Sequence, residues 1–323
     1  MSAFHADIGF EFGIPDIVHG RAMSIHAGEL LGWFDVAERD LPWRADGVTP
    51  WQILVSEFML QQTPVARVLP IWSDWVARWP TPSATAAATP AEVLRAWGKL
   101  GYPRRAKRLH ECATVIARDF ADVVPDDVET LEQLPGIGSY TARAVACFAY
   151  RKPVPVVDTN VRRVVARAVH GLADAAAPSA KRDHADVGAL LALLPKAAQA
   201  ARFSAALMEL GATVCTARTP RCAACPLRAC AWRDRGFPPG STVRRPAQRY
   251  AGTDRQVRGR LLDVLRDNVL PVTKAELDVA WPVDPVQRER ALASLLDDGL
   301  VERLADDRFV LPGQDRNDST ASR

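Results

Sequence analysis

The chain has 323 residues, of which 48% are apolar and 24% are charged, and its formal net charge is only +3. This length allows two domains, or one large domain with an appendage, and the apolar content allows a sizeable core without disulfides. The small net charge gives no overall argument for binding to nucleic acid. We find neither a charged-then-apolar signal peptide nor a run of about eighteen apolar residues, which argues against secreted and membrane-spanning classes. We therefore expect a cytoplasmic protein without a membrane partner.

Helical periodicity dominates the chain from residue 25 to residue 232. Apolar residues return at steps of three and four, short Pro/Gly breaks separate these segments, and alternating strand patterns are scarce. Prolines near the expected helix starts agree with the N-terminal preference of this residue. The sequence therefore predicts an all-helical body. Its predicted helices are 27–38, 51–60, 64–79, 90–100, 103–119, 127–133, 140–150, 159–169 and 202–210.

The composition changes after Trp232. A stretch rich in Gly, Pro and Arg follows, as is typical of a basic linker. The remaining pattern has three short helices and then two strand-like runs with Asp306-Asp307 between them, which is the order of a winged helix. We expect a small winged-helix-like module there, and a flexible leader and tail at the two ends. The predicted ranges are leader 1–24, body 25–232, linker 233–254, module 255–313 and tail 314–323, with module helices at 256–267, 274–280 and 286–296 and strands at 301–304 and 308–311.

Four of the six cysteines lie within sixteen residues, in the pattern Cys215-x6-Cys222-x2-Cys225-x4-Cys230. In an intracellular chain, clustered cysteines indicate a metal site more than disulfides. Four thiolates in one loop can hold either a zinc ion or a [4Fe–4S] cluster, although structural zinc usually uses two C-x2-C pairs. The surrounding arginines suit a phosphate backbone, or are simply a solvated charged face. The other two cysteines, Cys112 and Cys147, are expected in the core.

A second motif is the glycine-containing segment 134–142, Leu-Pro-Gly-Ile-Gly-Ser-Tyr-Thr-Ala. Gly136 and Gly138 let the backbone approach a ligand, and they leave free amides at the start of the next helix, where a phosphate can bind. Such a pattern alone often marks just a tight turn. With a predicted helix on each side, it indicates a hairpin that grips one DNA strand.

Two carboxylates are candidates for acid–base chemistry. Asp158 ends an apolar run just before an Arg-rich helix, where it could serve as an N-cap or could stabilise a cationic sugar. Glu57 interrupts the apolar helix 51–60, and burial would raise its pKa as a general acid requires. The alternative for Glu57 is an exposed position on the helix surface. Polar residues 61–63 end that helix and suit contacts with base edges.

Together these residues resemble adenine DNA glycosylases of the MutY type, in the endonuclease III superfamily. The resemblance implies an all-α, helix-hairpin-helix glycosylase body of two lobes, with one [4Fe–4S] cluster loop at 215–230. It covers about residues 30–232. The motifs that carry it are Leu41-Pro42-Trp43-Arg44, Ser56-Glu57-Phe58-Met59-Leu60-Gln61-Gln62-Thr63, Leu100-Gly101-Tyr102, the hairpin 134–142, Val157-Asp158-Thr159-Asn160-Val161-Arg162-Arg163, Met208-Glu209-Leu210-Gly211 and the four cysteines.

The resemblance also implies a role for each matching residue. Glu57 would protonate adenine, Asp158 would stabilise the cationic sugar, and Asn160 would position the water or Asp158. Tyr140 stands where bifunctional relatives carry the attacking lysine, so the enzyme would be monofunctional. The expected partner is double-stranded DNA with adenine opposite 8-oxoguanine or guanine, bound by a monomer. Residues expected around the extruded adenine or the opposing base are Trp43, Arg44, Leu60, Gln62, Leu100, Tyr102 and Glu209.

Three features depart from the family pattern. The last cysteine spacing is one residue shorter than usual, and Pro103 replaces a second tyrosine. The residues after Trp232 are short for the family's Nudix-like domain and lack its Phe-Ser-His-type loop. Two other functions remain as alternatives: a glycosylase/lyase for oxidised pyrimidines, and a non-catalytic iron–sulfur regulator that binds DNA.

Overall fold

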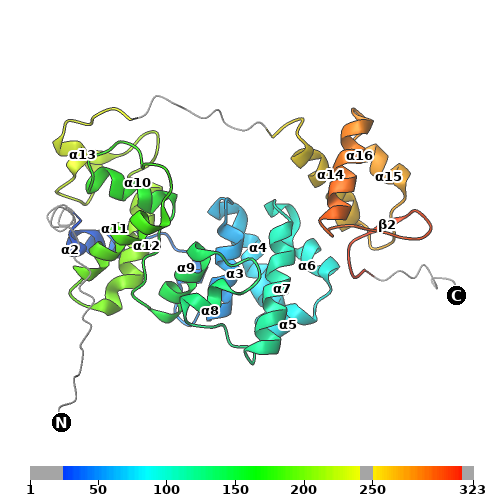
Figure 1. Ribbon diagram of the computed structural model, residues 1–323, viewed down its shortest axis with the longest axis horizontal. Coiled ribbons are helices and arrows are strands. Elements are labelled where there is room, and N and C mark those ends of the chain that lie inside the picture. The colour runs from blue at the N-terminus through cyan, green and yellow to red at the C-terminus, as the bar shows by residue number, and fades with distance from the viewer. Residues whose placement is uncertain (1–24, 241–249, 315–323) are drawn as a thin grey trace, which may run out of the picture. The chain divides into compact units, whose positions relative to one another are not determined.

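The computed structural model describes residues 25–240 and 250–314 (Figure 1). The predicted leader 1–24, residues 241–249 of the predicted linker and tail residues 315–323 lie outside these ranges. The described residues form two compact units. We call residues 25–39 with 151–240 the first unit, and residues 40–150 with 250–314 the second unit. No helix in the described ranges is both long and apolar enough to cross a bilayer.

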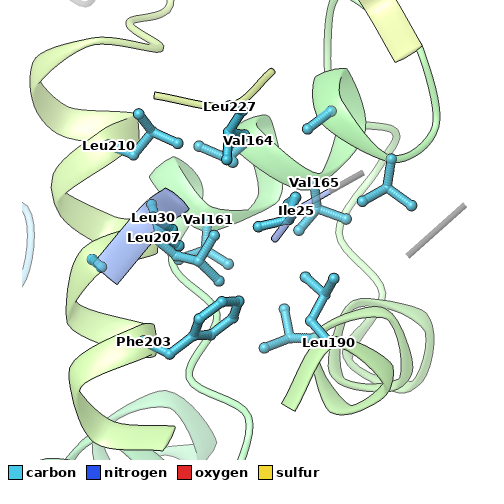
Figure 2. Close-up of a cluster of buried hydrophobic side chains, with 14 of the residues drawn as sticks. Ile25, Leu30, Val161, Val164, Val165, Leu190, Phe203, Leu207, Leu210 and Leu227 are labelled. Atoms are coloured by element: carbon cyan, nitrogen blue, oxygen red, sulfur yellow. The ribbon is translucent and has the colours of Figure 1, made fainter. Parts of the chain in front are cut away.

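The first unit is helical throughout, and its helices bury one apolar cluster (Figure 2). Leu227 from the cysteine-containing segment packs into the same cluster, so that segment is tied to the core. The helices of the first unit are α2 (Ala27–Ala37), α10 (Thr159–Ala168), α11 (Ala180–Ala192), η3 (Ala197–Gln199), α12 (Ala200–Thr213), η4 (Cys222–Ala224) and α13 (Ala231–Asp234).

Helices α10 and α12 pack unusually closely at Gly211. A Cβ atom added there would lie 2.7 Å from Cβ of Asn160 and 2.8 Å from its carbonyl oxygen. Backbone atoms cannot move aside as a flexible side chain can. The absence of a side chain at Gly211 therefore sets the distance between the two helices at Asn160.

The second unit holds the remaining elements, of which all but two short strands are helical. They are η1 (Pro42–Arg44), α3 (Pro50–Leu60), α4 (Val65–Arg78), α5 (Pro82–Ala87), α6 (Pro90–Trp97), η2 (Gly98–Leu100), α7 (Arg104–Asp119), α8 (Val128–Glu132), α9 (Ser139–Tyr150), α14 (Asp254–Asp267), α15 (Lys274–Ala280), α16 (Pro285–Asp297), β1 (Glu302–Arg303) and β2 (Phe309–Val310).

Helix α3 lies at the centre of the second unit. Thr49 and Gln52 form a capping box at its start, with Pro50 at the first helical position, which the missing amide of proline suits. Residues 53–59 are all buried, and α3 packs against α4, α7 and α9. A helix that is buried on every side holds the side chains along it in fixed positions.

The C-terminal module has the predicted winged-helix order. Helices α14, α15 and α16 (Figure 1) are followed by the antiparallel pair β1–β2. In this pair Glu302 lies opposite Val310 and Arg303 lies opposite Phe309. Val272 adds a bridge to Phe309. The predicted helices and strands of this module are confirmed to within two residues.

Inside the second unit this module packs on α6, η2 and α7. The mostly buried Arg266 donates from Nε to the carbonyl oxygen of Leu94 at 3.1 Å, and burial lowers the pKa of its guanidinium. In return, Nη2 of Arg95 donates to the carbonyl oxygen of Asn268 at 2.8 Å and to Oε1 of Gln314 at 2.7 Å. Reciprocal guanidinium–carbonyl bonds fix this contact more firmly than apolar burial alone would.

The all-helical body and its helices are confirmed, with ends shifted by a few residues. Besides short turns such as α13, two helices were not predicted. Helix α5 lies in the biased stretch 80–90, where Thr81 caps a run of small residues. Helix α11 is capped by Ser179, and its buried residues occur only in its second half. Both segments lack the sustained apolar periodicity that identifies a helix from sequence.

We predict that Gly211→Ala lowers the free energy of unfolding by about 1–3 kcal/mol, because the new methyl group overlaps backbone atoms of Asn160. Gly32→Ala is the matched control. Gly32 is an exposed glycine in α2 with no atom within 4 Å of an added Cβ, so alanine should raise helix stability slightly. Thermal unfolding compares the two. Equal stability of both variants would contradict the close packing of α10 on α12.

Candidate active site and cysteine loop

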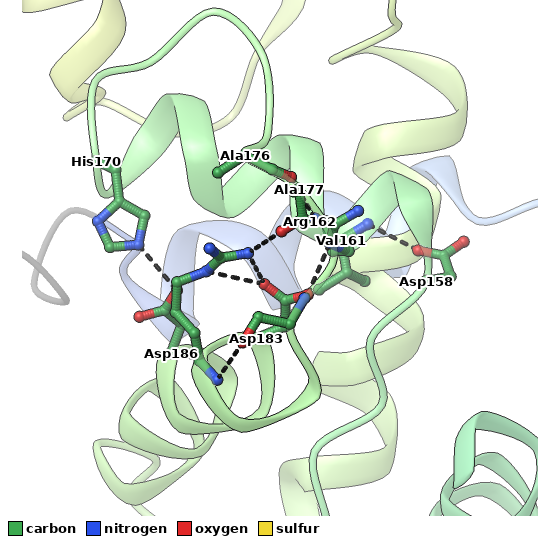
Figure 3. Close-up of polar contacts among 10 residues, drawn as sticks. Asp158, Val161, Arg162, His170, Ala176, Ala177, Asp183 and Asp186 are labelled. Atoms are coloured by element: carbon green, nitrogen blue, oxygen red, sulfur yellow. Dashed lines mark hydrogen bonds and ion pairs between the residues drawn. The ribbon is translucent and has the colours of Figure 1, made fainter.

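Asp158 is the N-cap of α10, as the structural alternative for this residue predicted. Its Oδ1 accepts from the amide of Val161 at 2.7 Å (Figure 3). Its Oδ2 accepts from Nδ2 of Asn160 at 2.8 Å. Two donors on two different oxygens fix the plane of the carboxyl group. Capping and a chemical role are therefore compatible, because the cap is what orients the carboxylate.

The surroundings of Asp158 act on its charge in opposite directions. Burial raises the pKa of the Asp158 carboxyl group. The hydrogen bonds from Val161 and Asn160 and the positive charge of Arg163 oppose this increase, because they favour the ionised form. The ionised form of this half-buried group therefore depends on these donors.

Arg163 connects this carboxylate to the cysteine loop. Its Nη2 donates to Oδ1 of Asn160 and to the carbonyl oxygen of Gly211, both at 2.7 Å. Its Nε donates to the carbonyl oxygen of Cys215, also at 2.7 Å. A continuous chain of hydrogen bonds therefore runs from Asp158 through Asn160 and Arg163 to Cys215.

A second ion-pair system holds the other side of α10 (Figure 3). Arg162 donates from Nε to Oδ2 of Asp183 on α11 at 2.8 Å. Nε2 of His170 lies 2.9 Å from Oδ2 of Asp186 on the same helix. Helix α10 is thus fixed to α11 on one side and to the cysteine loop on the other.

The four cysteines of the loop line one cavity of about 30 Å³, together with apolar side chains and the cations Arg167 and Arg233. Arg167 is buried and donates from Nη1 to Sγ of Cys215 at 3.5 Å and to the carbonyl oxygen of Thr216 at 2.7 Å. Its guanidinium also lies 4.8 Å from the ring of Trp232. The buried Arg167 and the half-buried Arg233 can offset negative charge beside these thiols, as a thiolate-bound metal group requires.

Two thiols of this cavity, those of Cys222 and Cys225, disfavour ionisation on their own. Burial raises the pKa of Cys222 and of Cys225, and the neighbouring cysteines raise both further. Within the described ranges, no three or more Cys, His, Asp or Glu side chains stand close enough together to hold a single metal ion. The cysteines therefore surround a shared space without closing on one atom. By contrast, Cys112 and Cys147 are buried core residues, as predicted, and burial raises the pKa of Cys112 to about 12.

Glu209 lies on α12 of the first unit and is completely buried. Its carboxylate accepts from Nε of Arg39 at 2.5 Å and from Nη2 at 3.1 Å. This two-pronged ion pair compensates for burial of the charge. Arg39 was not singled out from the sequence, because nothing in its own neighbourhood indicates a partner 170 residues away.

Glu57 lies on α3 of the second unit and is buried, with 6% of its surface exposed. The exposed alternative for this residue is therefore wrong. Leu60, on the same helix, is half-buried, whereas Gln62 in the following turn is exposed and has a positive φ of 53°. Trp43 in η1 is half-buried and packs edge-on against Trp72, with ring centroids 5.7 Å apart.

Arg105 joins the turn after α3 to the turn before α7. It donates to the carbonyl oxygens of Phe58 at 2.9 Å and Gln61 at 2.5 Å, and to that of Gly101 at 3.1 Å. Burial lowers the pKa of this guanidinium to about 10. The sequence held one signal for it: a cation in the first turn of a helix opposes the helix dipole and so needs another partner.

The hairpin 134–142 connects α8 to α9, as predicted. Gly136 has φ of 78°, and an added Cβ would lie 2.7 Å from Cβ of Arg108 and 3.0 Å from the ring of Phe58. Gly138 is exposed just before α9, and Tyr140, the second residue of that helix, is half-buried. Phe58 belongs to α3, so the hairpin packs directly on the helix that carries Glu57.

Comparisons with known proteins agree with this architecture. A family model for the HhH-GPD superfamily of base excision DNA repair proteins matches residues 55–184. The adenine DNA glycosylase of Mycobacterium tuberculosis (strain CDC 1551 / Oshkosh) is 74% identical over 285 residues, which cover 88% of this chain and 93% of that protein. The adenine DNA glycosylase of Mycolicibacterium smegmatis is 71% identical over 292 residues, covering 90% and 98%.

A solved structure of a trapped endonuclease III–DNA covalent intermediate matches with a TM-score of 0.56 at 20% identity, over 70% of this chain and all of that one, which shows the shared fold. The helical body and its hairpin thus define a helix-hairpin-helix protein of the base excision repair superfamily. Within that class, the chain belongs to the adenine DNA glycosylase family.

We predict that Asn160→Ala raises the pKa of Asp158 further. The amide of Asn160 donates to the ionised carboxylate, so its loss disfavours the charged form. Carboxyl ¹³C titration by NMR measures this, with the resonance assigned from Asp158→Asn. Thr159→Ala changes the exposed neighbour and should leave the titration unchanged. An Asp158 titration that stays in place in Asn160→Ala would show that this hydrogen bond does not control the charge.

Proposed function

We propose that this protein hydrolyses the N-glycosidic bond of adenine mispaired with 8-oxoguanine or guanine in double-stranded DNA, and leaves an abasic site. The observation that carries the proposal is the geometry of Asp158: a half-buried carboxylate whose two oxygens are fixed by Val161 and Asn160. This geometry occurs in a chain 74% identical to an adenine DNA glycosylase. A fixed carboxylate in a site of low polarity can stabilise a positive charge that develops on a sugar.

In the proposed reaction, two carboxyl groups have different roles in base release. Adenine is a poor leaving group as an anion, so protonation of its ring by Glu57 would make departure possible. The sugar that remains has oxocarbenium character, and Asp158 would stabilise it while a water molecule, positioned with help from Asn160, adds to the sugar carbon. Glu57 belongs to the second unit and Asp158 to the first.

Tyr140 makes the proposed reaction purely hydrolytic. A lysine at this position of the hairpin could form a Schiff base with the opened sugar, but a phenol cannot. The product would be an intact strand with an abasic site. Strand cleavage would then need a later chemical or enzymatic step.

The remaining site residues would bind DNA. An adenine within a duplex must be flipped into a pocket before reaction, at a cost of a few kcal/mol, which is lower at a mispair. We assign Trp43, Arg44, Leu60, Leu100 and Glu209 to the surroundings of the flipped adenine. Gln62 and Tyr102 would contact the opposing base, and Gly136 and Gly138 would bring hairpin amides to a phosphate. We further propose a monomer in the cytoplasm, with its domains divided as predicted: body 25–232, linker 233–254 and module 255–313.

We also propose that Cys215, Cys222, Cys225 and Cys230 hold one [4Fe–4S] cluster. The four thiols line one cavity, and the loop contains one C-x2-C pair, whereas structural zinc usually uses two such pairs. When bound, the cluster would fix the basic loop in shape; base release itself uses only the protein's side chains. Arg163 would transmit this order to Asn160 and Asp158 through the Cys215 carbonyl.

The variant Asp158→Asn removes the negative charge of this residue and keeps a side chain that can cap α10, so it tests the two roles separately. Asparagine caps helices as well as aspartate does, so stability should change little, whereas base release should fall by at least about 100-fold through loss of charge stabilisation. Glu57→Gln should have a similar effect on release and spare DNA binding. Single-turnover release of adenine opposite 8-oxoguanine or guanine measures both. Near wild-type release by either variant would contradict the assigned roles, and no adenine release by the wild type would contradict the proposed function.

The cluster proposal predicts a brown protein with about four iron atoms per chain after anaerobic purification. Cys225→Ser should lose iron, and Cys112→Ala, a core cysteine outside the loop, should keep it. Metal analysis of the three proteins decides the matter. Stoichiometric zinc in the wild type would reject the cluster.

A further inference from the structure

The turn of Gly101 and Tyr102 presents an exposed aromatic ring. Tyr102 is 43% exposed and has a positive φ of 49°, and Gly101 before it has φ of 85°. A tyrosine in the left-handed region is strained, and the strain persists only where neighbours hold the backbone. Arg105 holds this turn through the Gly101 carbonyl, and its guanidinium lies 5.4 Å from the Tyr102 ring.

The C-terminal module reaches the same ring from α14. Nη1 of Arg255 donates to the phenol oxygen of Tyr102 at 3.0 Å, and its guanidinium lies 5.8 Å from the centre of that ring. The guanidinium also lies 5.3 Å from the ring of Tyr250. Tyr102 is thus bound by Arg105 from α7 and by Arg255 from α14.

This contact is part of a hydrogen-bonded interface between α7 and the C-terminal module. Asp298, at the end of α16, binds Arg104 of α7, and its carbonyl oxygen accepts from Nζ of Lys107 at 3.2 Å. Nη2 of Arg258 on α14 donates to Oδ2 of the same aspartate at 2.5 Å. Arg258 lies one turn after Arg255 on α14. Its bond to Asp298 therefore holds this part of α14 in place and limits the positions that the Arg255 side chain can take.

The charge distribution of the module indicates which face would meet DNA. In winged helices that read DNA, the third helix enters the major groove. Here α16 exposes Glu289 and Asp297 beside Arg290, and the turn between the strands carries Asp306 and Asp307. Glu289 is paired with Lys274, and the turn aspartates are paired with Arg308 and Arg303, so this surface has mixed charge and offers few unpaired cations to phosphates. The start of α14, by contrast, brings a guanidinium to the aromatic ring of Tyr102, the combination that binds nucleic acid bases and phosphates.

We propose that Arg255 is a positioning residue that holds Tyr102 in place against the base opposite the excised adenine. The module would thereby contribute to recognition of the mispair through α14, and not through the helix that usually reads DNA in winged helices. This inference rests on the proposed function, and in particular on the contact of Tyr102 with the opposing base.

The test is equilibrium binding to duplexes that carry a tetrahydrofuran abasic-site analogue opposite 8-oxoguanine or guanine, with a fully paired duplex as reference. Arg255→Ala should weaken binding to the analogue duplexes about tenfold, since one hydrogen bond to a charged group is lost. Binding to the paired duplex should change less than about twofold, because generic phosphate attraction is largely kept. Arg255→Lys, which can still donate to the phenol oxygen, should recover part of the loss.

Two further variants separate positioning from a general loss of charge. Tyr102→Phe removes the phenol oxygen and should match Arg255→Ala, and the double variant should bind no more weakly than either single one. Arg260→Ala removes an exposed cation from another face of α14 and should bind like the wild type. At saturating enzyme, single-turnover release of adenine by Arg255→Ala should stay within about twofold of the wild type.

Several results would overturn the inference: wild-type binding by Arg255→Ala, equal weakening on the paired duplex, or multiplied losses in the double variant. Failure of the proposed function looks different. In that case the wild type itself would neither prefer the analogue duplexes nor release adenine.

Discussion

The geometry of the site depends on the hydrogen bonds that hold the Asp158 carboxylate at the start of α10. Burial alone raises its pKa and would favour the neutral form, which cannot stabilise a cation. The amide of Val161 and the side chain of Asn160 counter this effect, and Arg163 holds Asn160 in turn. Arg163 also donates to the carbonyl oxygens of Gly211 and Cys215. The position of the carboxylate therefore depends on the positions of α12 and the cysteine loop.

In the second unit, Arg105 has the role that Arg163 has in the first: it holds backbone segments in place through hydrogen bonds to carbonyl oxygens. Glu57 is placed by a helix that is buried on all sides, and the turns on which the proposed DNA contacts Gln62 and Tyr102 stand are joined by Arg105. From the C-terminal module, the exposed Arg255 donates to the phenol oxygen of Tyr102 and not to a backbone carbonyl. In both units, buried or half-buried arginines donate to backbone carbonyl oxygens. These bonds hold the backbone in place, and so they fix the positions of the side chains proposed for catalysis and DNA binding.

The helical body, the hairpin and the winged-helix order of the module could be predicted because apolar periodicity, glycine and proline positions and caps are local signals. Helices α5 and α11 escaped prediction because their buried residues are few and small, or confined to half the helix. The carboxylates and the cysteines stood out as polar or clustered residues in distinctive motifs. Their supports did not: Arg39, Arg105 and Arg163 bind partners 44 to 170 residues away in sequence, and no local pattern reveals such a pairing.

The central claim is hydrolytic removal of adenine by a site that lacks an attacking amine. The most direct measurement is product analysis after reaction with a duplex carrying adenine opposite 8-oxoguanine, with and without alkali, beside a duplex carrying thymine glycol. The account predicts free adenine and an abasic strand that breaks only after alkali, and no reaction at thymine glycol. Strand cleavage without alkali, a borohydride-trapped protein–DNA complex, or excision of thymine glycol would contradict it.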